Sequence, residues 1–270
     1  MGADSVLLCA QESGGKVSNL FRGTRIVNGQ SVETVHEGEL EFLISHRFGR
    51  LNGGAYELFG LDQASIRIGL EYGVRDWLMV GLGRSSVGKH YDFFGKMRLV
   101  QQGDGVPLAV TAFASAALNT LRPSSPDRPI PFQSRWAYTS QLLLARKFGP
   151  GFTLQLSPTF IHYNLVETRQ DRNDVLALGA GARVQLTKNI ALMVEYFHSL
   201  PEQLPEDRRP ALALGFDINT GSHVFQLHFT NAQSMIEKGF IGETTGDWLA
   251  GDIQFGFNIA RTFKLKGRRY

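Results

Sequence analysis

The segments of this chain that alternate apolar and polar residues are separated by gaps whose lengths also alternate, short then long, from end to end. The short gaps span residues 73–76, 101–106, 147–151, 187–189 and 219–222. The long, polar gaps span residues 49–64, 85–91, 120–134, 166–173, 199–209 and 231–247. This rhythm is expected of an up-and-down sheet whose two rims face different surroundings, because antiparallel neighbours are joined at each rim in turn.

The alternation within the segments predicts β-strands. In residues 253–261, Ile253, Phe255, Phe257 and Ile259 share one face, and small or polar residues share the other. A period of two places successive side chains on opposite faces of a strand. The same pattern, cleaner in some segments than in others, predicts twelve strands: 39–48, 65–72, 77–84, 91–100, 108–119, 135–146, 152–165, 174–186, 190–198, 211–218, 223–230 and 253–261.

A closed barrel explains these strands better than a soluble sandwich does. Most of the segments are longer than the roughly 5–6 residues usual for soluble strands. Their number is even, as in single-chain bacterial barrels, and closure removes unpaired strand edges. The sequence therefore predicts an all-β, closed, up-and-down antiparallel transmembrane β-barrel, with short periplasmic turns and long outer loops.

Composition excludes several other classes of protein. Hydrophobic residues make up 43% of the 270-residue chain and charged residues 20%, which excludes a disordered chain. No apolar run approaches the roughly 20 residues of a membrane helix, so strands are the expected way across a bilayer. The 28 basic and 25 acidic residues are spread along the sequence. Nucleic-acid binding needs a clustered basic face, so no nucleic-acid partner is expected.

The residues before the first predicted strand form two pieces. Residues 1–10, which include the single cysteine Cys9, resemble the end of a secretory signal peptide with cleavage before Gln11. Residues 11–38 contain Asn28-Gly29 between β-forming residues, which predicts a hairpin with a type I′ turn. This second piece is expected to plug the barrel or to lie on its periplasmic side, either as a hairpin or as an arm. Residues 39–270 form the predicted barrel.

Polar side chains opposite the apolar faces are expected to line the lumen. The candidates are Glu41, Arg47, Arg67, Glu71, Arg84, Arg98, Arg183, Glu195, Asp217 and His228. Charges of both signs in one lumen usually pair, because an ion buried alone costs several kcal/mol. Two interpretations stay open, a structural ion network across a narrow barrel or a polar pathway that binds or passes a solute.

Neither catalysis nor a cofactor is predicted. Several histidines, including His46 and His198, lie near the long-gap ends of strands but lack the close spacing of metal ligands. The adjacent pairs Ser45/His46 and His198/Ser199 point to opposite faces of a strand, so neither pair can act together. No motif of a nucleotide-binding loop, serine hydrolase or zinc protease occurs. We expect no catalytic residue and no metal site.

Several stretches resemble an uncharacterised family of bacterial outer-membrane β-barrels, domain of unknown function five-seven-seven-seven. They include Gly81-Leu82-Gly83-Arg84-Ser85-Ser86 and residues 21–25, 28–33, 45–49, 59–62, 64–67, 145–148, 221–231 and 235–240. The resemblance covers nearly everything after Leu20. It implies a barrel in the outer membrane, and it implies no known activity and no catalytic residues.

These observations predict a bacterial outer-membrane barrel surrounded by lipid. The expected function is passage or binding of a small polar solute through the mixed-charge lumen. A structural or docking barrel that engages partner proteins through its loops or N-terminal segment is the alternative. A membrane-embedded lipid hydrolase is a third, less favoured interpretation.

Overall fold

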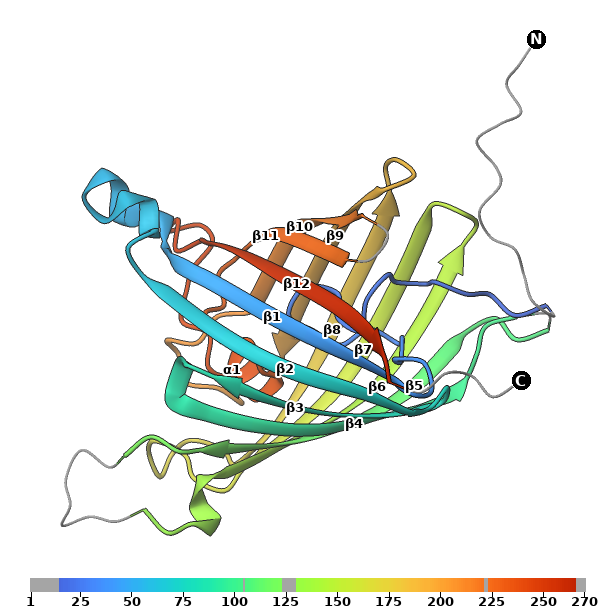
Figure 1. Cartoon of the computed structure of the whole chain (residues 1–270). Helices are drawn as coiled ribbons and strands as arrows, with labels where there is room; N and C mark the ends of the chain where they lie inside the picture. Colours follow the sequence, from blue (N-terminus) through green and yellow to red (C-terminus); the bar gives the residue numbers. More distant parts are fainter. Residues whose placement is uncertain (1–14, 104, 123–129, 221–222, 266–270) are drawn as a thin grey trace.

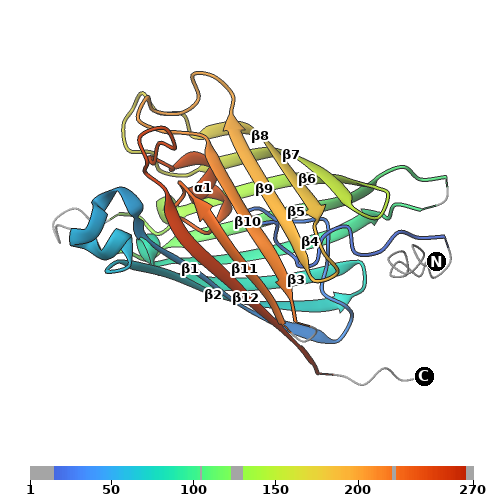
Figure 2. The same cartoon turned by 90° about the horizontal axis from the view of Figure 1, so that it is seen from above.

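The computed structural model describes residues 15–103, 105–122, 130–220 and 223–265 (Figure 1). The predicted signal-peptide remnant, residues 1–10, lies outside the described residues. Within them, one barrel encloses a segment that comes from the N-terminal side of its first strand (Figure 2).

Twelve antiparallel strands close into the barrel, and β1 pairs with β12 to complete it. The strands are β1 (Glu39–Arg50), β2 (Ala64–Arg75), β3 (Leu78–Ser85), β4 (His90–Val100), β5 (Ala109–Asn119), β6 (Trp136–Phe148), β7 (Phe152–Tyr163), β8 (Asp174–Gln185), β9 (Ile190–Ser199), β10 (Ala211–Asn219), β11 (His223–Thr230) and β12 (Gln254–Lys264). The predicted closed up-and-down barrel is therefore confirmed. Closure pairs the backbone groups of every strand on both sides, as a bilayer requires.

The two rims of the barrel differ. At the short-turn rim, residues 76–77 join β2 to β3 and residues 149–151 join β6 to β7. At the long-loop rim, residues 51–63 join β1 to β2 and residues 231–253 join β11 to β12. Two predicted gap lengths are wrong. Residues 101–108 link β4 to β5, so this connection at the short-turn rim is longer than predicted. Only residues 86–89 link β3 to β4, because Ser85 and His90 extend these strands beyond the predicted bounds.

The helical pieces all lie in connections at the long-loop rim. They are η1 (Leu51–Gly60), η2 (Val87–Lys89), η3 (Gln133–Arg135) and α1 (Glu237–Gly242). In the part of the chain that the structure describes, no helix is long and apolar enough to cross a membrane.

Side chains alternate between the interior and the outer surface along the strands. On β2, Arg67 and Glu71 are buried inside the barrel, whereas Ile68 and Leu70 point outward with 45% and 37% of their surface exposed. Similar apolar side chains cover the outside of the other strands. An apolar surface of this extent suits a lipid surrounding rather than water.

The N-terminal segment, residues 19–38, runs into the interior of the barrel from the short-turn rim (Figure 2). Its apolar side chains, among them Phe21 and Ile26, form one buried cluster with the inward-facing wall residues Phe113, Leu143 and Met193. We call this segment the plug. Burying this apolar surface stabilises the plug in place, by roughly 25 cal/mol for each Å² removed from water.

Gly73 on β2 lies where the plug ends and β1 begins. Gly38 donates its backbone N–H to the Gly73 carbonyl at 2.9 Å, and Glu37 forms a β-bridge with Gly73. A Cβ at Gly73 would lie 1.9 Å from the backbone oxygen of His36. Because the obstacle is backbone, Gly73→Ala is expected to lower the free energy of unfolding by about 1–3 kcal/mol in a denaturant titration.

The control for this variant is Gly151→Ala in another short turn. A Cβ there would meet no heavy atom of the described chain within 4 Å. Equal stability of the two variants would show that the contact between Gly73 and the end of the plug is not tightly packed.

Candidate functional site

The plug is a hairpin inside the lumen, and its turn differs from the predicted one. Ile26 donates its N–H to the carbonyl of Gly29 at 2.8 Å, and Arg25 and Gln30 form an antiparallel β-bridge. The turn therefore centres on Val27 and Asn28. Neither Asn28 nor Gly29 has the positive φ that a type I′ turn requires, so that prediction is wrong.

The shift of the turn has a physical cause in the wall of the barrel. The carboxylate of Glu195 on β9 accepts the backbone N–H groups of Val27, Asn28 and Gly29 at 3.0, 2.9 and 2.9 Å. Three successive N–H groups that converge on one anion form a nest. Hydrogen bonds to a charged acceptor are stronger than neutral ones, so this contact overrides the local preference of Asn-Gly.

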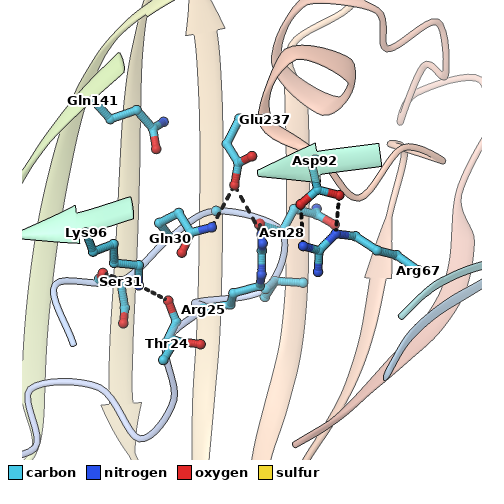
Figure 3. A network of polar contacts seen from close by, with 12 residues as sticks. Thr24, Arg25, Asn28, Gln30, Ser31, Arg67, Asp92, Lys96, Gln141 and Glu237 are labelled. Atoms are coloured by element: carbon cyan, nitrogen blue, oxygen red, sulfur yellow. Dashed lines mark hydrogen bonds and ion pairs between the residues drawn. The ribbon is translucent and has the colours of Figure 1, made fainter. Parts of the chain in front are cut away.

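Lys96 on β4 makes the complementary contact. Its ammonium donates to the carbonyl oxygens of Thr24, Ser31 and Glu33 at 2.7, 3.1 and 3.0 Å (Figure 3). An ammonium has three hydrogens, and all three are used here. The wall thus holds the plug by one anion on its N–H groups and one cation on its carbonyls.

Neutral side chains of the barrel wall donate hydrogen bonds to further backbone carbonyls of the hairpin. Gln226 and Asn258, on β11 and β12, donate to the carbonyls of Ile26 and Val27 at 2.8 and 2.9 Å. Gln155 on β7 donates to the carbonyl of Gln30 at 2.7 Å. Wall strands on opposite sides of the lumen therefore contact the same short segment.

Arg25 of the plug joins it to α1, which descends from the long-loop rim. Its guanidinium donates to Glu237 on α1 at 3.2 Å and lies 3.9 Å from Glu71 on β2. Gln30 donates to the same Glu237 oxygen at 2.8 Å (Figure 3). Two segments that enter the lumen from opposite rims therefore meet in its interior.

A second buried ion pair lies beside Arg25. Arg67 holds Asp92 through two hydrogen bonds of 3.0 and 2.5 Å, and both side chains are buried. The ring of Phe94 lies near both cations, 5.7 Å from the Arg25 guanidinium carbon and 5.9 Å from that of Arg67. Cation–π contact and bidentate pairing offset part of the cost of burying these charges.

The helix α1 is anchored to the wall near the long-loop rim. Tyr163 on β7 donates its hydroxyl to the backbone oxygen of Lys238 at 2.7 Å. Phe240 packs against the Phe197 ring of β9 with centroids 5.1 Å apart. Both aromatic contacts lie in an apolar cluster that is separate from the one around the plug. The plug therefore packs in the short-turn half of the lumen, and α1 packs in the long-loop half.

Above α1, a cavity of about 490 Å³ opens at the long-loop rim. We call it the mouth pocket. Its lining includes Arg50, Gln63, Gln233, Thr245 and Gln254. The pocket is bounded by two long loops, residues 51–63 and 231–253, and by the ends of β1 and β12.

Asp252 ties these two loops together. It pairs with Arg50 at 2.9 Å and accepts from the Asn52 amide at 2.8 Å. The Asn52 amide and the backbone N–H of Asp247 hold the pKa of the Asp252 carboxyl below its usual range. A lowered pKa keeps the carboxylate charged at neutral and mildly acidic pH, and this tie weakens only as the pH falls through the folded-state value.

The structure places the ten lumen candidates as follows. Eight are buried on inward-facing strand positions: Glu41, Arg47, Arg67, Glu71, Arg183, Glu195, Asp217 and His228. Arg98 faces inward near the short-turn rim and pairs with Glu33 of the plug at 3.4 Å. Five of the ten, Glu41, Arg47, Glu71, Arg98 and Glu195, contact the plug directly.

The prediction that Arg84 lines the lumen is wrong. It lies on the outer face of β3, and its guanidinium covers the ring of Tyr91 at 5.0 Å. Its strand neighbours Gly83 and Ser85 occupy the inward positions. An outward arginine is tolerated here because it is next to the long-loop rim, where its charged group reaches water.

The ten candidates leave out several residues of the site. Gln155, Gln226 and Asn258 bond the plug. Asp92 and Glu237 complete buried ion pairs, and Gln254 lines the mouth pocket. Alternation with Phe94 and Lys96 marks Asp92 as inward-facing and could have identified it. Nothing local identifies Glu237, because its role depends on a loop that folds back into the lumen.

Comparison with known proteins supports the architecture. The fold resembles the NanC porin, with a TM-score of 0.50 at 8% identity over 84% of this chain and 100% of that one. It also resembles an outer-membrane channel from Pseudomonas putida F1, with a TM-score of 0.53 at 11% identity over 86% and 98% of the two chains. At this identity the likeness concerns the fold alone. A comparison with curated proteins finds no significant match.

The family described as membrane bound beta barrel domain (DUF5777) matches residues 21–263. That range begins within the plug and ends within β12. The family therefore includes the lumenal segment as well as the barrel, and this chain belongs to the DUF5777 membrane-bound β-barrel family.

Proposed function

We propose that this protein is a channel of the bacterial outer membrane that binds and passes small polar solutes, and that its plug closes it at rest. The short-turn rim faces the periplasm, and the long-loop rim with its mouth pocket faces outside. Family membership and the likeness to a porin and an outer-membrane channel support this assignment.

The polar attachment of the plug is the observation that carries the proposal. Lys96, Gln155, Glu195, Gln226 and Asn258 hold it by hydrogen bonds. These groups also hydrogen-bond to water, so a plug that moves aside leaves a wall that water can wet. A purely apolar interior would strongly disfavour such a movement, because its surfaces would be exposed to water.

Conductance in planar lipid bilayers tests the proposal. The intact chain is expected to show rare, brief openings. The double variant Glu195→Ala/Lys96→Met is expected to stay open for about tenfold longer or more, since a loss of 1.4 kcal/mol in plug attachment shifts the equilibrium tenfold. Gln141→Ala is the matched control, because this lumenal amide bonds Thr159 of the neighbouring strand.

A bilayer that stays sealed with both the intact chain and the folded double variant would contradict the channel. Equal opening of the double variant and the Gln141→Ala control would instead show that the plug does not gate the lumen.

The exposed tips of the long loops favour docking as a second function. Tyr56 on η1 and Leu249 are 97% and 99% exposed, and Leu58 and Phe59 are also exposed. Apolar side chains this far in solvent gain stability when another surface covers them. A sealed bilayer, together with a protein partner that is lost on Tyr56→Ser, would support docking over conduction.

We propose no enzymatic activity. His162 lies 2.6 Å from Asp174, and His90 lies 3.0 Å from the carbonyl of Val87. Such partners orient an imidazole, but hydrolysis also needs a nucleophile within hydrogen-bond reach of it. Fatty-acid release from phospholipid vesicles, abolished by a single serine substitution, would overturn this proposal.

A further inference from the structure

We propose that the mouth pocket is a binding site for neutral, hydroxyl-rich compounds of the size of a mono- or disaccharide. The inference rests on the proposed function, because it names the class of solute that the channel would bind. The mouth pocket has a volume of about 490 Å³, which falls within the usual range of small-molecule sites, roughly 300–1,000 Å³.

The charged side chains at the pocket are already neutralised by the protein. Arg50 pairs with Asp252 at 2.9 Å and donates to Thr245 at 3.4 Å. Glu243 pairs with Lys238 at 2.6 Å. A ligand therefore meets few free charges on these sides of the pocket.

Glu57 is the remaining carboxylate in the lining. It folds back on its own loop, where one of its carboxylate oxygens lies 2.5 Å from the position that a Cβ at Gly53 would occupy. A carboxylate disfavours anions and attracts amines. Because of Glu57, amines are the main class of ligand that would compete with a neutral compound for this pocket.

The rest of the polar lining consists of amides and hydroxyls. Gln63, Gln233, Ser234 and Thr244 line the pocket together with Gln254. Amide and hydroxyl side chains each offer both donors and acceptors. A sugar hydroxyl also donates and accepts, so this lining matches a polyol better than it matches an ion or an apolar molecule.

Gln254 supplies an independent sign that the pocket awaits a donor. Its side chain is only 4% exposed, it faces inward at the start of β12, and it lines the pocket. Its Oε1 is buried with no hydrogen-bond partner among the described residues. Other lumenal acceptors, among them Gln141 Oε1, share this state, but they lie outside the pocket lining. Unpaired buried acceptors are uncommon because they lose their hydration without compensation. A ligand hydroxyl would restore the missing hydrogen bond.

Calorimetric titration of the full chain in detergent micelles tests the inference. Glucose and sucrose are the neutral probes, and glucosamine and glucuronate are the cationic and anionic analogues. At least one neutral probe is expected to bind at least about tenfold more tightly than either charged analogue. Gln254→Leu is expected to weaken binding about tenfold, which corresponds to one lost hydrogen bond.

Gln63→Ala is a second variant at an exposed loop position, where folding is insensitive to the change, and it is also expected to weaken binding. Gln141→Leu, a lumenal amide outside the pocket lining, is the matched control and should bind normally. The inference is overturned if neither neutral sugar binds, if a charged analogue binds more tightly, or if folded Gln254→Leu and Gln63→Ala both bind as the unmodified chain does.

This outcome is independent of the conductance test. Sugar binding to a barrel that never conducts would retain the pocket and reject the channel. Conduction without sugar binding would retain the channel and reject the pocket as a saccharide site.

Discussion

Glu195→Ala is expected to release the plug hairpin from β9. The change leaves the N–H groups of Val27, Asn28 and Gly29 in the interior without their shared acceptor. Removing one partner of a buried charged contact costs about 3–5 kcal/mol. Because 1.4 kcal/mol is a factor of ten, amide hydrogen exchange in residues 20–35 should accelerate by about two orders of magnitude or more, as measured by mass spectrometry of peptic fragments.

Glu195→Gln provides a graded comparison, because it keeps one acceptor oxygen and should loosen the hairpin less than alanine does. Gln141→Ala should leave exchange in residues 20–35 unchanged, since its side chain bonds Thr159 across the wall. Full protection of residues 20–35 in folded Glu195→Ala would show that apolar packing alone retains the plug.

Lys96→Met is expected to weaken the attachment of the plug by a similar amount, through the loss of a positive charge instead of a negative one. Methionine preserves most of the side-chain length but offers no donor to the carbonyls of Thr24, Ser31 and Glu33. The free energy of unfolding should fall by about 3–5 kcal/mol in a denaturant titration, because several buried acceptors lose their partner at once.

Arg98→Met, two residues along β4, is the matched control. Its side chain is 19% exposed, and its guanidinium pairs with Glu33 of the same plug at 3.4 Å. Partly exposed ion pairs contribute about 0–1 kcal/mol, so the loss should be much smaller. Similar losses for Lys96→Met and Arg98→Met would contradict the role given to the buried ammonium.

The sequence predicted the barrel because hydrophobic alternation is a local signal. On β8 and β12, inward and outward positions follow directly from the order of the residues. On β3, the exposed side chains Val80 and Leu82 mark the outer face, and Arg84 follows them in the alternation. The lumen prediction for Arg84 is therefore wrong, and its polarity reflects its place near the rim.

The interior could be predicted only in part. Asn28-Gly29 lies in the hairpin of the plug, but the position of the turn depends on Glu195, which lies far away in sequence. The pairing of Arg25 with Glu237 and the mouth pocket likewise depend on how the 231–253 loop folds back. Contacts of this kind arise from tertiary structure, and one sequence carries no local pattern for them.

The enclosure of the N-terminal hairpin also has a consequence for the order in which the barrel folds. The ribosome makes this hairpin first, yet Gln226 and Asn258 on β11 and β12, made last, hold its carbonyls. Joining the two ends of so long a chain carries the largest loop-closure entropy in the fold. A hairpin already seated against Lys96 and Glu195 offers the final strands a surface to dock on. We therefore expect the segment that fills the finished barrel also to guide the pairing of its last strands with its first.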